Sequence, residues 1–351
     1  MDSPTPAAVA AAPSTAAPSK PAIAVPGPGG RIYQNYDINL EGAREQISDI
    51  GLAVVPNVLS PDECVSLRDD TWRELKRITR SQFDYENPST WPQYRSKLKP
   101  LRDMLMHCGD IGHMQSLWDA RQHPSVVQAF ARLWSTTMDD LICSFDGLSA
   151  HLPLPNDDKK IAAGASGTRK KGLHVDQGRT KDGLQCIQGL IPLYDVHYGD
   201  SSLHLIEGSH LHYDDYFRRY PFRNDSDFVF VNHPEFHLNR GCRETFVQAT
   251  AGSLILWDSR LVHEAGSVLP QALRAMPNNP RMVLYICMIP REKATEADLR
   301  GRINAFKELQ TTSHYPVPLQ VFSPIRGYKN LNPVRRPFLT PLGRRLVGFE
   351  K

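Results

Sequence analysis

The chain has 351 residues, 40% of them hydrophobic and 23% charged, with a formal net charge of +3. This composition is typical of a soluble globular protein with one large domain or two small ones, and the nearly balanced charge argues neither for nor against a polyanionic partner. The sequence contains no run of eighteen apolar residues, so we expect no membrane-spanning helix. The six cysteines are scattered without a Cys-x-x-Cys pair, so we expect reduced, mostly buried thiols rather than a zinc ribbon or a disulfide framework.

Residues 1–30 consist mainly of alanine, proline and small polar residues. Such a stretch cannot bury enough apolar surface to fold, and we expect a disordered tail. An organellar transit peptide is the alternative, but it would be rich in arginine, and none precedes Arg31. We therefore expect one folded domain over 31–325. Without a secretory segment we expect it in the cytoplasm, with an organelle or the nucleus as alternatives.

The first half of this domain is predicted to be mainly helical. Residues 41–50 suit a short helix, and 51–60 suit a strand of β-branched residues that ends in a turn. Ser60 and Glu63 have the spacing of a capping box, and they open a helix whose apolar residues recur at three- and four-residue steps. A further helix begins at Pro124. These helices are expected to pack against a sheet.

The second half is predicted to be rich in strands, because short apolar stretches alternate with turn residues. The expected strands cover 141–153 (as one strand or a bent pair), 184–196, 203–208, 254–257 and 281–290. In this order of elements the helices come first and the strands later. It favours a sandwich or barrel, with a core over about 141–290, rather than alternating βα units. A glycine-rich segment over 156–179 is predicted to be a flexible loop, and 210–243 is an insertion rich in aromatic and charged residues.

The end of the chain is basic. Thr295 and Asp298 have capping-box spacing and predict a helix over 295–309. The extension over 326–351 carries pairs of arginines and is broken by prolines. We interpret it as a solvated tail that wraps the domain. The alternative is contact with an anionic substrate, such as a CoA ester or nucleic acid.

One short segment suggests a metal site. His174 and Asp176 stand two residues apart in an expected strand, so an imidazole and a carboxylate would project from the same face. His263, which follows the strand 254–257, is the best candidate for a third ligand. Two histidines and one carboxylate on one face of an iron leave three positions open. The spacing alone is a weak signal, because His212 with Asp214 and His233 with Glu235 repeat it.

The order of the segments makes the signal specific. His174-x-Asp176 is followed by YGDSSLHLIEGSH, then by LILWDSRLVHEAG, and then by an arginine that opens a strand. This series resembles the phytanoyl-CoA dioxygenase-like family of iron(II)/2-oxoglutarate oxygenases over residues 50–310. The resemblance implies a mainly β fold with flanking helices, namely a double-stranded β-helix, which is a jelly-roll or cupin-like barrel. It also implies that His174, Asp176 and His263 hold the metal, and it disfavours His212, which follows the middle block.

The resemblance further implies the cofactors and the reaction. Fe(II) would bind 2-oxoglutarate and O2, and decarboxylation of the 2-oxo acid to succinate and CO2 would drive oxidation of a substrate, with ascorbate as the reductant in vitro. Relatives that halogenate lack the carboxylate ligand, so Asp176 favours hydroxylation or a related oxidation.

Further residues are expected around the metal. A guanidinium fork suits the distal carboxylate of 2-oxoglutarate, and Arg281 opens the strand where the family has this arginine. Arg274 lies closer to the spacing usual in the family and is the alternative. A metal-bound imidazole usually donates its other N–H to a neighbouring group. For His263 we expect this support from the nearby residues Trp257, Asp258 and Arg260. The alternative is a buried tryptophan and a surface ion pair.

These observations favour a hydroxylase that acts on a small molecule. A first alternative keeps the chemistry but takes a nucleobase or protein side chain as substrate, with the insertion and the basic extension as contact surfaces. A second alternative is a cupin-like binding module without turnover. The complete ligand set argues against that module, because binding alone does not require three iron ligands.

Overall fold

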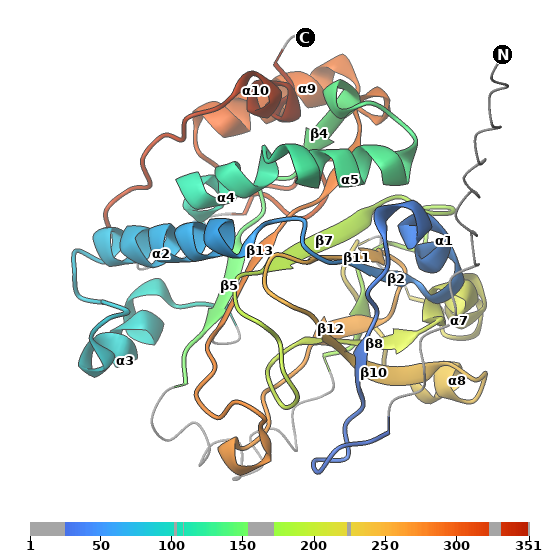
Figure 1. Ribbon diagram of the computed structural model, residues 1–351. Helices are drawn as coiled ribbons and strands as arrows, with labels where there is room; N and C mark the ends of the chain where they lie inside the picture. Colours follow the sequence, from blue (N-terminus) through green and yellow to red (C-terminus); the bar gives the residue numbers. More distant parts are fainter. Residues whose placement is uncertain are drawn as a thin grey trace, which may run out of the picture.

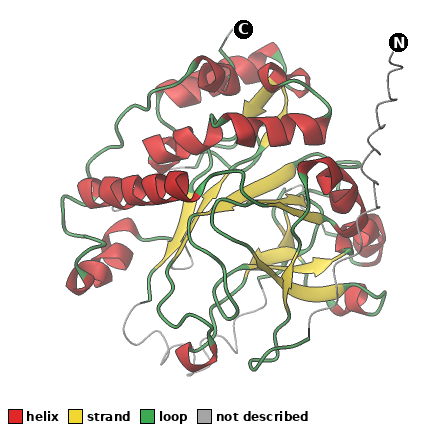
Figure 2. Cartoon of the chain, in the orientation of Figure 1, coloured by secondary structure: helices red, strands yellow, loops and turns green. Residues whose placement is uncertain are grey.

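Two facing β-sheets form the centre of the computed structural model, and helices cover one side of them (Figures 1 and 2). The structure describes residues 25–101, 104–107, 109–153, 172–222, 226–322 and 331–349. The predicted mainly β architecture with flanking helices is confirmed. Within the described ranges, no helix combines the length and the apolar character needed to cross a membrane.

Both sheets have six strands, and we call the one whose strands contain more residues the larger sheet. In the larger sheet each adjacent pair is antiparallel. In sheet order the strands are β2 (Leu52–Val55), β11 (Leu254–Asp258), β7 (Ile187–Pro192), β13 (Arg281–Tyr285), β5 (Leu148–His151) and β3 (Leu105–Met106). Because successive strand residues point to opposite faces, Ile255 and Trp257 face the second sheet while Leu254 and Leu256 face the helices. The continuous apolar stretches of the sequence therefore serve two cores.

The smaller sheet also has six strands. In sheet order they are β1 (Tyr33–Asn35), β10 (Arg243–Gln248), β8 (Leu203–Glu207), β12 (His263–Ala265), β6 (His174–Val175) and β9 (Val229–Phe230). The β1–β10 pair is parallel and the others are antiparallel. A separate pair joins β4 (Leu141–Cys143) to β14 (Met288–Pro290). Leu203 and Leu205 meet Leu190 and Val283 of the larger sheet between the two layers.

The α-helices lie outside the two sheets. Their bounds are α1 (Leu40–Ile50), α2 (Pro61–Ile78), α3 (Trp91–Gln93), α4 (Gln115–Arg121), α5 (Pro124–Trp134), α7 (Tyr213–Arg219), α8 (Glu235–Leu238), α9 (Glu296–Lys307) and α10 (Pro341–Val347). Both predicted capping boxes are present: Ser60 caps α2 with Glu63, and Thr295 caps α9 with Asp298. The helices α2 and α5 pack their apolar faces on the larger sheet, as expected from the sequence, and α4, which was not predicted, packs between them in the same core.

Several predicted segments differ in detail from the structure. The apolar stretch 141–153 forms two strands, β4 and β5, separated by a bend. The insertion 210–243 forms α7, β9 and α8, whose aromatic residues pack on the outer face of the smaller sheet. Cysteines 64, 143, 186 and 287 are buried and unpaired, as expected. The predicted disordered tail and the predicted loop lie largely outside the described residues, but residues 25–30 are described and include a turn.

The C-terminal extension is not the solvated tail that its arginines suggested. It ends in α10, which packs against β4 and α9, and its Leu346 and Val347 are fully buried. Arg302 of α9 accounts for this packing, because its buried guanidinium donates to the carbonyls of Leu346 (3.0 Å) and Val347 (3.1 Å). The same group donates to the carbonyls of Cys143 (2.5 Å) and Pro316 (2.8 Å). One side chain therefore joins three separate segments.

We predict that Arg302→Met lowers the free energy of unfolding by about 3 kcal/mol, because four buried carbonyls lose their donor. Urea denaturation followed by circular dichroism measures the change. Arg300→Met on the exposed side of the same helix is the control, and we expect it to change stability by less than about 0.5 kcal/mol. Equal effects of the two substitutions would contradict this account of Arg302.

Candidate metal centre and cavity

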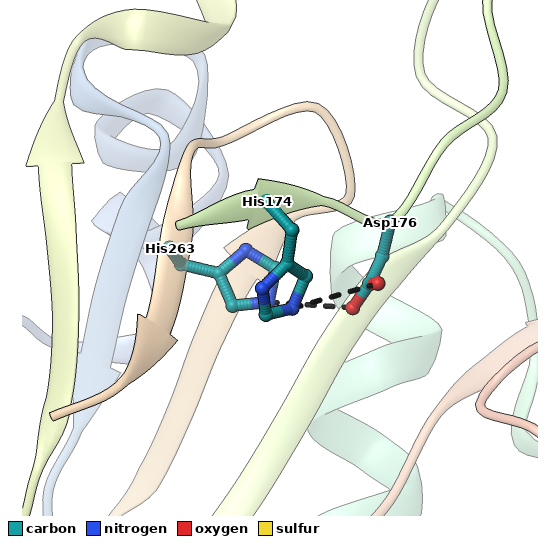
Figure 3. Close-up of side chains that lie close together, drawn as sticks. All are labelled: His174, Asp176 and His263. Atoms are coloured by element: carbon teal, nitrogen blue, oxygen red, sulfur yellow. Dashed lines mark ion pairs between the residues drawn. The ribbon is translucent and has the colours of Figure 1, made fainter. Parts of the chain in front are cut away.

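Two neighbouring strands of the smaller sheet carry the three candidate ligands. In the antiparallel pair of β6 and β12, His174 lies directly opposite His263, so both imidazoles project from the same face of the sheet. Asp176 follows β6 by one residue, and its backbone N–H donates to the carbonyl of Ser259 at 2.9 Å. This bond fixes the turn after the strand. Figure 3 shows the two rings side by side, with the carboxylate of Asp176 facing both.

The three side chains are close enough to share one ion. The Nε2 atom of His174 is 3.7 Å from Oδ1 of Asp176, and Nε2 of His263 is 3.3 Å from Oδ2. A metal–ligand distance of about 2.1 Å separates neighbouring ligands by roughly 3 Å, which is close to these values. All three residues are buried. In the described part of the chain, no other three His, Cys, Asp or Glu residues converge in this way.

Backbone carbonyls set the orientation of both imidazoles. Nδ1 of His174 contacts the carbonyl of Gly172 at 2.6 Å, and Nδ1 of His263 contacts the carbonyl of Leu261 at 2.8 Å. Because a carbonyl only accepts hydrogen bonds, each Nδ1 carries a proton, and in the deprotonated form that binds a metal each ring presents the lone pair of Nε2 to Asp176. Two lone pairs and a carboxylate that converge in a buried space repel one another unless a cation lies between them. The donor set therefore fits a divalent metal.

Asp176 is held in its ionised form. The side-chain amide of Gln188 donates to its Oδ2 at 2.8 Å. Burial alone would raise the pKa of Asp176, but the positive charge that His314, His174 and His263 carry when protonated holds this pKa well below its usual range, and a divalent metal between the ligands would act in the same direction. A carboxylate at neutral pH is the form that binds a metal. Two histidines with one carboxylate is also the set that non-haem Fe(II) oxygenases use, with the remaining positions open.

The three residues open into a cavity of about 520 Å³ between the two sheets. Its wall is largely apolar, with Leu105, Leu190, Leu203, Trp257, Phe228 and Phe322 among the lining residues. This volume is in the range of small-molecule sites. An apolar wall around a few convergent polar groups offers water few hydrogen-bond partners beside the candidate metal.

Arg281 faces this cavity from the first position of β13. Its Nε is buried and has no hydrogen-bond partner among the described residues, and its Nη1 contacts only the sulfur of Met104, at 3.7 Å. No described carboxylate pairs with it. Arg274 is not among the residues that line the cavity. Its guanidinium forms an ion pair with Asp200 (2.8 Å) and donates to the carbonyl of Asn279 (2.9 Å). Of the two predicted arginines, only Arg281 offers its guanidinium to the cavity.

The residues predicted to support His263 do not accept the proton on its Nδ1. Trp257 lines the cavity with its ring centroid 5.4 Å from that of His263, and its Nε1 has no partner among the described residues. Asp258 and Arg260 pair with each other through bonds of 2.7 and 3.0 Å. The Nδ1 proton of His263 goes to Leu261 instead. Trp257 is buried, as in the alternative, but the ion pair is not the surface pair of that alternative, because Asp258 is buried as well.

The cavity contains polar residues that the sequence did not single out. Gln188, which orients Asp176, stood in an apolar strand, and a polar residue at an inward position is a recognisable signal. Asp146 and His314 also line the cavity, together with His107. His314 belongs to an irregular segment after α9, and no local pattern marks it.

Comparison with known proteins identifies the family. Residues 48–276 match the family model of phytanoyl-CoA dioxygenase. The chain belongs to this family. Phytanoyl-CoA dioxygenase enzymes use Fe(II) and 2-oxoglutarate, and the donor set described above fits that iron. As a member of the family, the protein is an enzyme of the oxygenase type.

The chain is also similar to individual known proteins. The chain is 29% identical over 283 residues to Ava biosynthesis cluster protein O of Aspergillus versicolor, covering 78% of this chain and 85% of the relative. The hypothetical protein JW0805 of Escherichia coli has a similar fold, with a TM-score of 0.54, 15% identity, and coverage of 92% of this chain and 87% of that one. GlcNAc Inducible Gene 2 of Candida albicans matches with a TM-score of 0.52, 14% identity, and coverage of 93% and 81%. These structural likenesses concern the fold alone.

We predict that Asp176→Ala or His263→Ala lowers the affinity for Fe(II) by more than about 100-fold, because each removes one of three ligands. Anaerobic titration with Fe(II), followed by metal analysis after gel filtration, measures the loss. His212→Ala removes a histidine from the other His-x-Asp sequence and is the control. Unchanged iron binding in Asp176→Ala would exclude this carboxylate as a ligand.

Proposed function

We propose that this protein is an Fe(II)/2-oxoglutarate-dependent dioxygenase that hydroxylates or otherwise oxidises a small organic molecule. One observation carries the proposal: a single cavity contains both the convergent His174, Asp176 and His263 and the guanidinium of Arg281. The first group suits a metal and the second suits an anion. Together they match the two requirements of a bound iron and a dicarboxylate.

Each residue has a distinct part in this proposal. His174, Asp176 and His263 would hold Fe(II), which with 2-oxoglutarate and O2 supplies the oxidising power as the 2-oxo acid loses CO2 and becomes succinate. Arg281 would anchor the distal carboxylate, for which its buried position strengthens the charge-assisted hydrogen bonds. Gln188 would keep the carboxylate of Asp176 in one orientation. The apolar wall would keep bulk water away from the reaction.

A small substrate is favoured over a macromolecule by the volume of the cavity and by what the other surfaces do. The aromatic residues of the insertion pack on the smaller sheet, and α10 of the basic extension packs on β4, so both segments are engaged within the molecule. The relative from Aspergillus versicolor carries the name of a biosynthesis cluster, which also supports a small-molecule substrate.

The decisive experiment is the detection of succinate. Protein purified without O2 receives Fe(II), 2-oxoglutarate and ascorbate and is then exposed to O2, with and without a library of small molecules. We expect slow succinate formation that requires Asp176, and a faster rate with an accepted substrate. A protein that holds no iron and forms no succinate would instead be a binding module.

We predict that Arg281→Ala raises the apparent KM for 2-oxoglutarate by about 100-fold, because a buried carboxylate loses a bidentate cation. Arg281→Lys keeps the charge but not the fork and should recover only part of the affinity. Initial rates of succinate formation at varied 2-oxoglutarate give both values. If a folded Arg274→Gln variant raised the KM and Arg281→Ala did not, Arg274 would be the anchor.

A further inference from the structure

One carboxylate in the cavity has no place in the proposed oxygenase machinery. Asp146 lies between β4 and β5, its side chain lines the cavity, and the residue is only 8% exposed. Its Oδ1 accepts one bond, from the backbone N–H of Gly147 at 2.6 Å. An ionised carboxylate can accept about four hydrogen bonds, so most of the capacity of Asp146 remains open toward the cavity.

No described cation is bonded to this carboxylate. The buried guanidinium of Arg121 lies nearby, but it donates to the backbone carbonyls of Asp146 and Gly112 and not to the side chain. His107 and His314 line the same cavity; burial lowers the pKa of His107, while the charge of Asp146 acts in the opposite direction. Burial also raises the pKa of Asp146, which reflects how poorly the empty cavity compensates its charge. A positively charged ligand would supply that compensation.

The backbone around Asp146 is rigid, as a binding group requires. Phe145 exchanges two bonds of 3.0 Å with Thr312, one through its N–H and one through its carbonyl. Gly147 packs so closely that a Cβ atom would lie 1.7 Å from the carbonyl oxygen of Met106. The fully buried Arg121 holds the carbonyl of Asp146 itself. Because these contacts preorganise the carboxylate, a ligand does not need to order it.

Asp146 and Arg281 line the cavity near the two ends of β13. Arg281 is the first residue of this strand, and the backbone N–H of its last residue, Tyr285, donates to the carbonyl of Gly147, next to Asp146, at 3.2 Å. At about 3.3 Å per residue, the length of β13 separates the two backbone positions by roughly 13 Å. One end of the cavity therefore attracts anions, and the other end attracts cations.

We propose that Asp146 binds a positively charged nitrogen of the substrate, which is accordingly a largely apolar molecule with an amine, amidine or guanidine group. This inference rests on the proposed function, in which the Arg281 end is taken by 2-oxoglutarate. It deepens that function by assigning the group that recognises the substrate. The apolar residues between the two ends, such as Phe228 and Phe322, would contact the body of the molecule.

Isothermal titration calorimetry tests the inference with two probes that share a skeleton, 4-phenylbutylamine and 4-phenylbutan-1-ol. The titrations are anaerobic, at pH 7.5, with Fe(II) and 2-oxoglutarate in the buffer. We expect the wild-type protein to bind the amine about tenfold more tightly than the alcohol, because a charge-assisted hydrogen bond is stronger than a neutral one. Asp146→Asn should remove this preference, with the affinity for the alcohol retained.

The matched control is Asp227→Asn, which neutralises another cavity carboxylate. Asp227 already pairs with Lys181 at 2.7 Å, so this variant should keep the preference for the amine. Equal affinities for the two probes, no binding of the amine, or a preference that survives in Asp146→Asn would overturn the inference. Thermal denaturation of both variants verifies that they are folded.

Iron content and substrate-free succinate formation by the same wild-type sample report on the proposed function separately. A sample that forms succinate but does not prefer the amine rejects only the role of Asp146. A sample that holds no iron but binds the amine through Asp146 rejects only the oxygenase.

Discussion

The register between β6 and β12 is the constraint on which the candidate site depends. It sets His174 opposite His263, and it brings Asp176 to the end of the same short strand. A slip of one residue would turn one imidazole to the opposite face of the sheet, where the aromatic residues of the insertion pack. The carbonyls of Gly172 and Leu261 then fix the rings within that register. Backbone geometry therefore performs the positioning that the sequence suggested for Asp258 and Arg260.

Features with a local physical cause could be predicted from the sequence. The capping boxes at Ser60 and Thr295 require only residues three apart, and the structure contains both. Short apolar stretches separated by turn residues are equally local, and they indicated a sandwich or barrel. His174, Asp176 and His263 were predicted from the order of three segments, and the structure brings them together, although their role as ligands remains a prediction. Arg281 could be separated from Arg274 only in three dimensions, because the ion pair with Asp200 joins positions 74 residues apart.

Features that depend on distant contacts could not be predicted. The arginine-rich extension appeared solvated because its partner, the guanidinium of Arg302, lies more than forty residues away. Asp146 and His314 line the same cavity although they lie far apart in the sequence, and neither segment has a periodic pattern. Asp146 in particular resembles an ordinary turn residue, with a glycine after it. Its exposure to the cavity follows from the packing around Phe145 and Thr312.

The position of β9 has a consequence for the evolution of this molecule. This strand belongs to the insertion, and it pairs with β6 on the side opposite β12, so that Phe230 lies beside His174. Phe228, from the same segment, contacts the ring of His174 with centroids 4.5 Å apart. Loop insertions usually tolerate sequence change because they stand apart from the framework that holds the functional residues. Here, a substitution in the insertion can shift β6, the strand that carries His174, because β9 pairs with it directly.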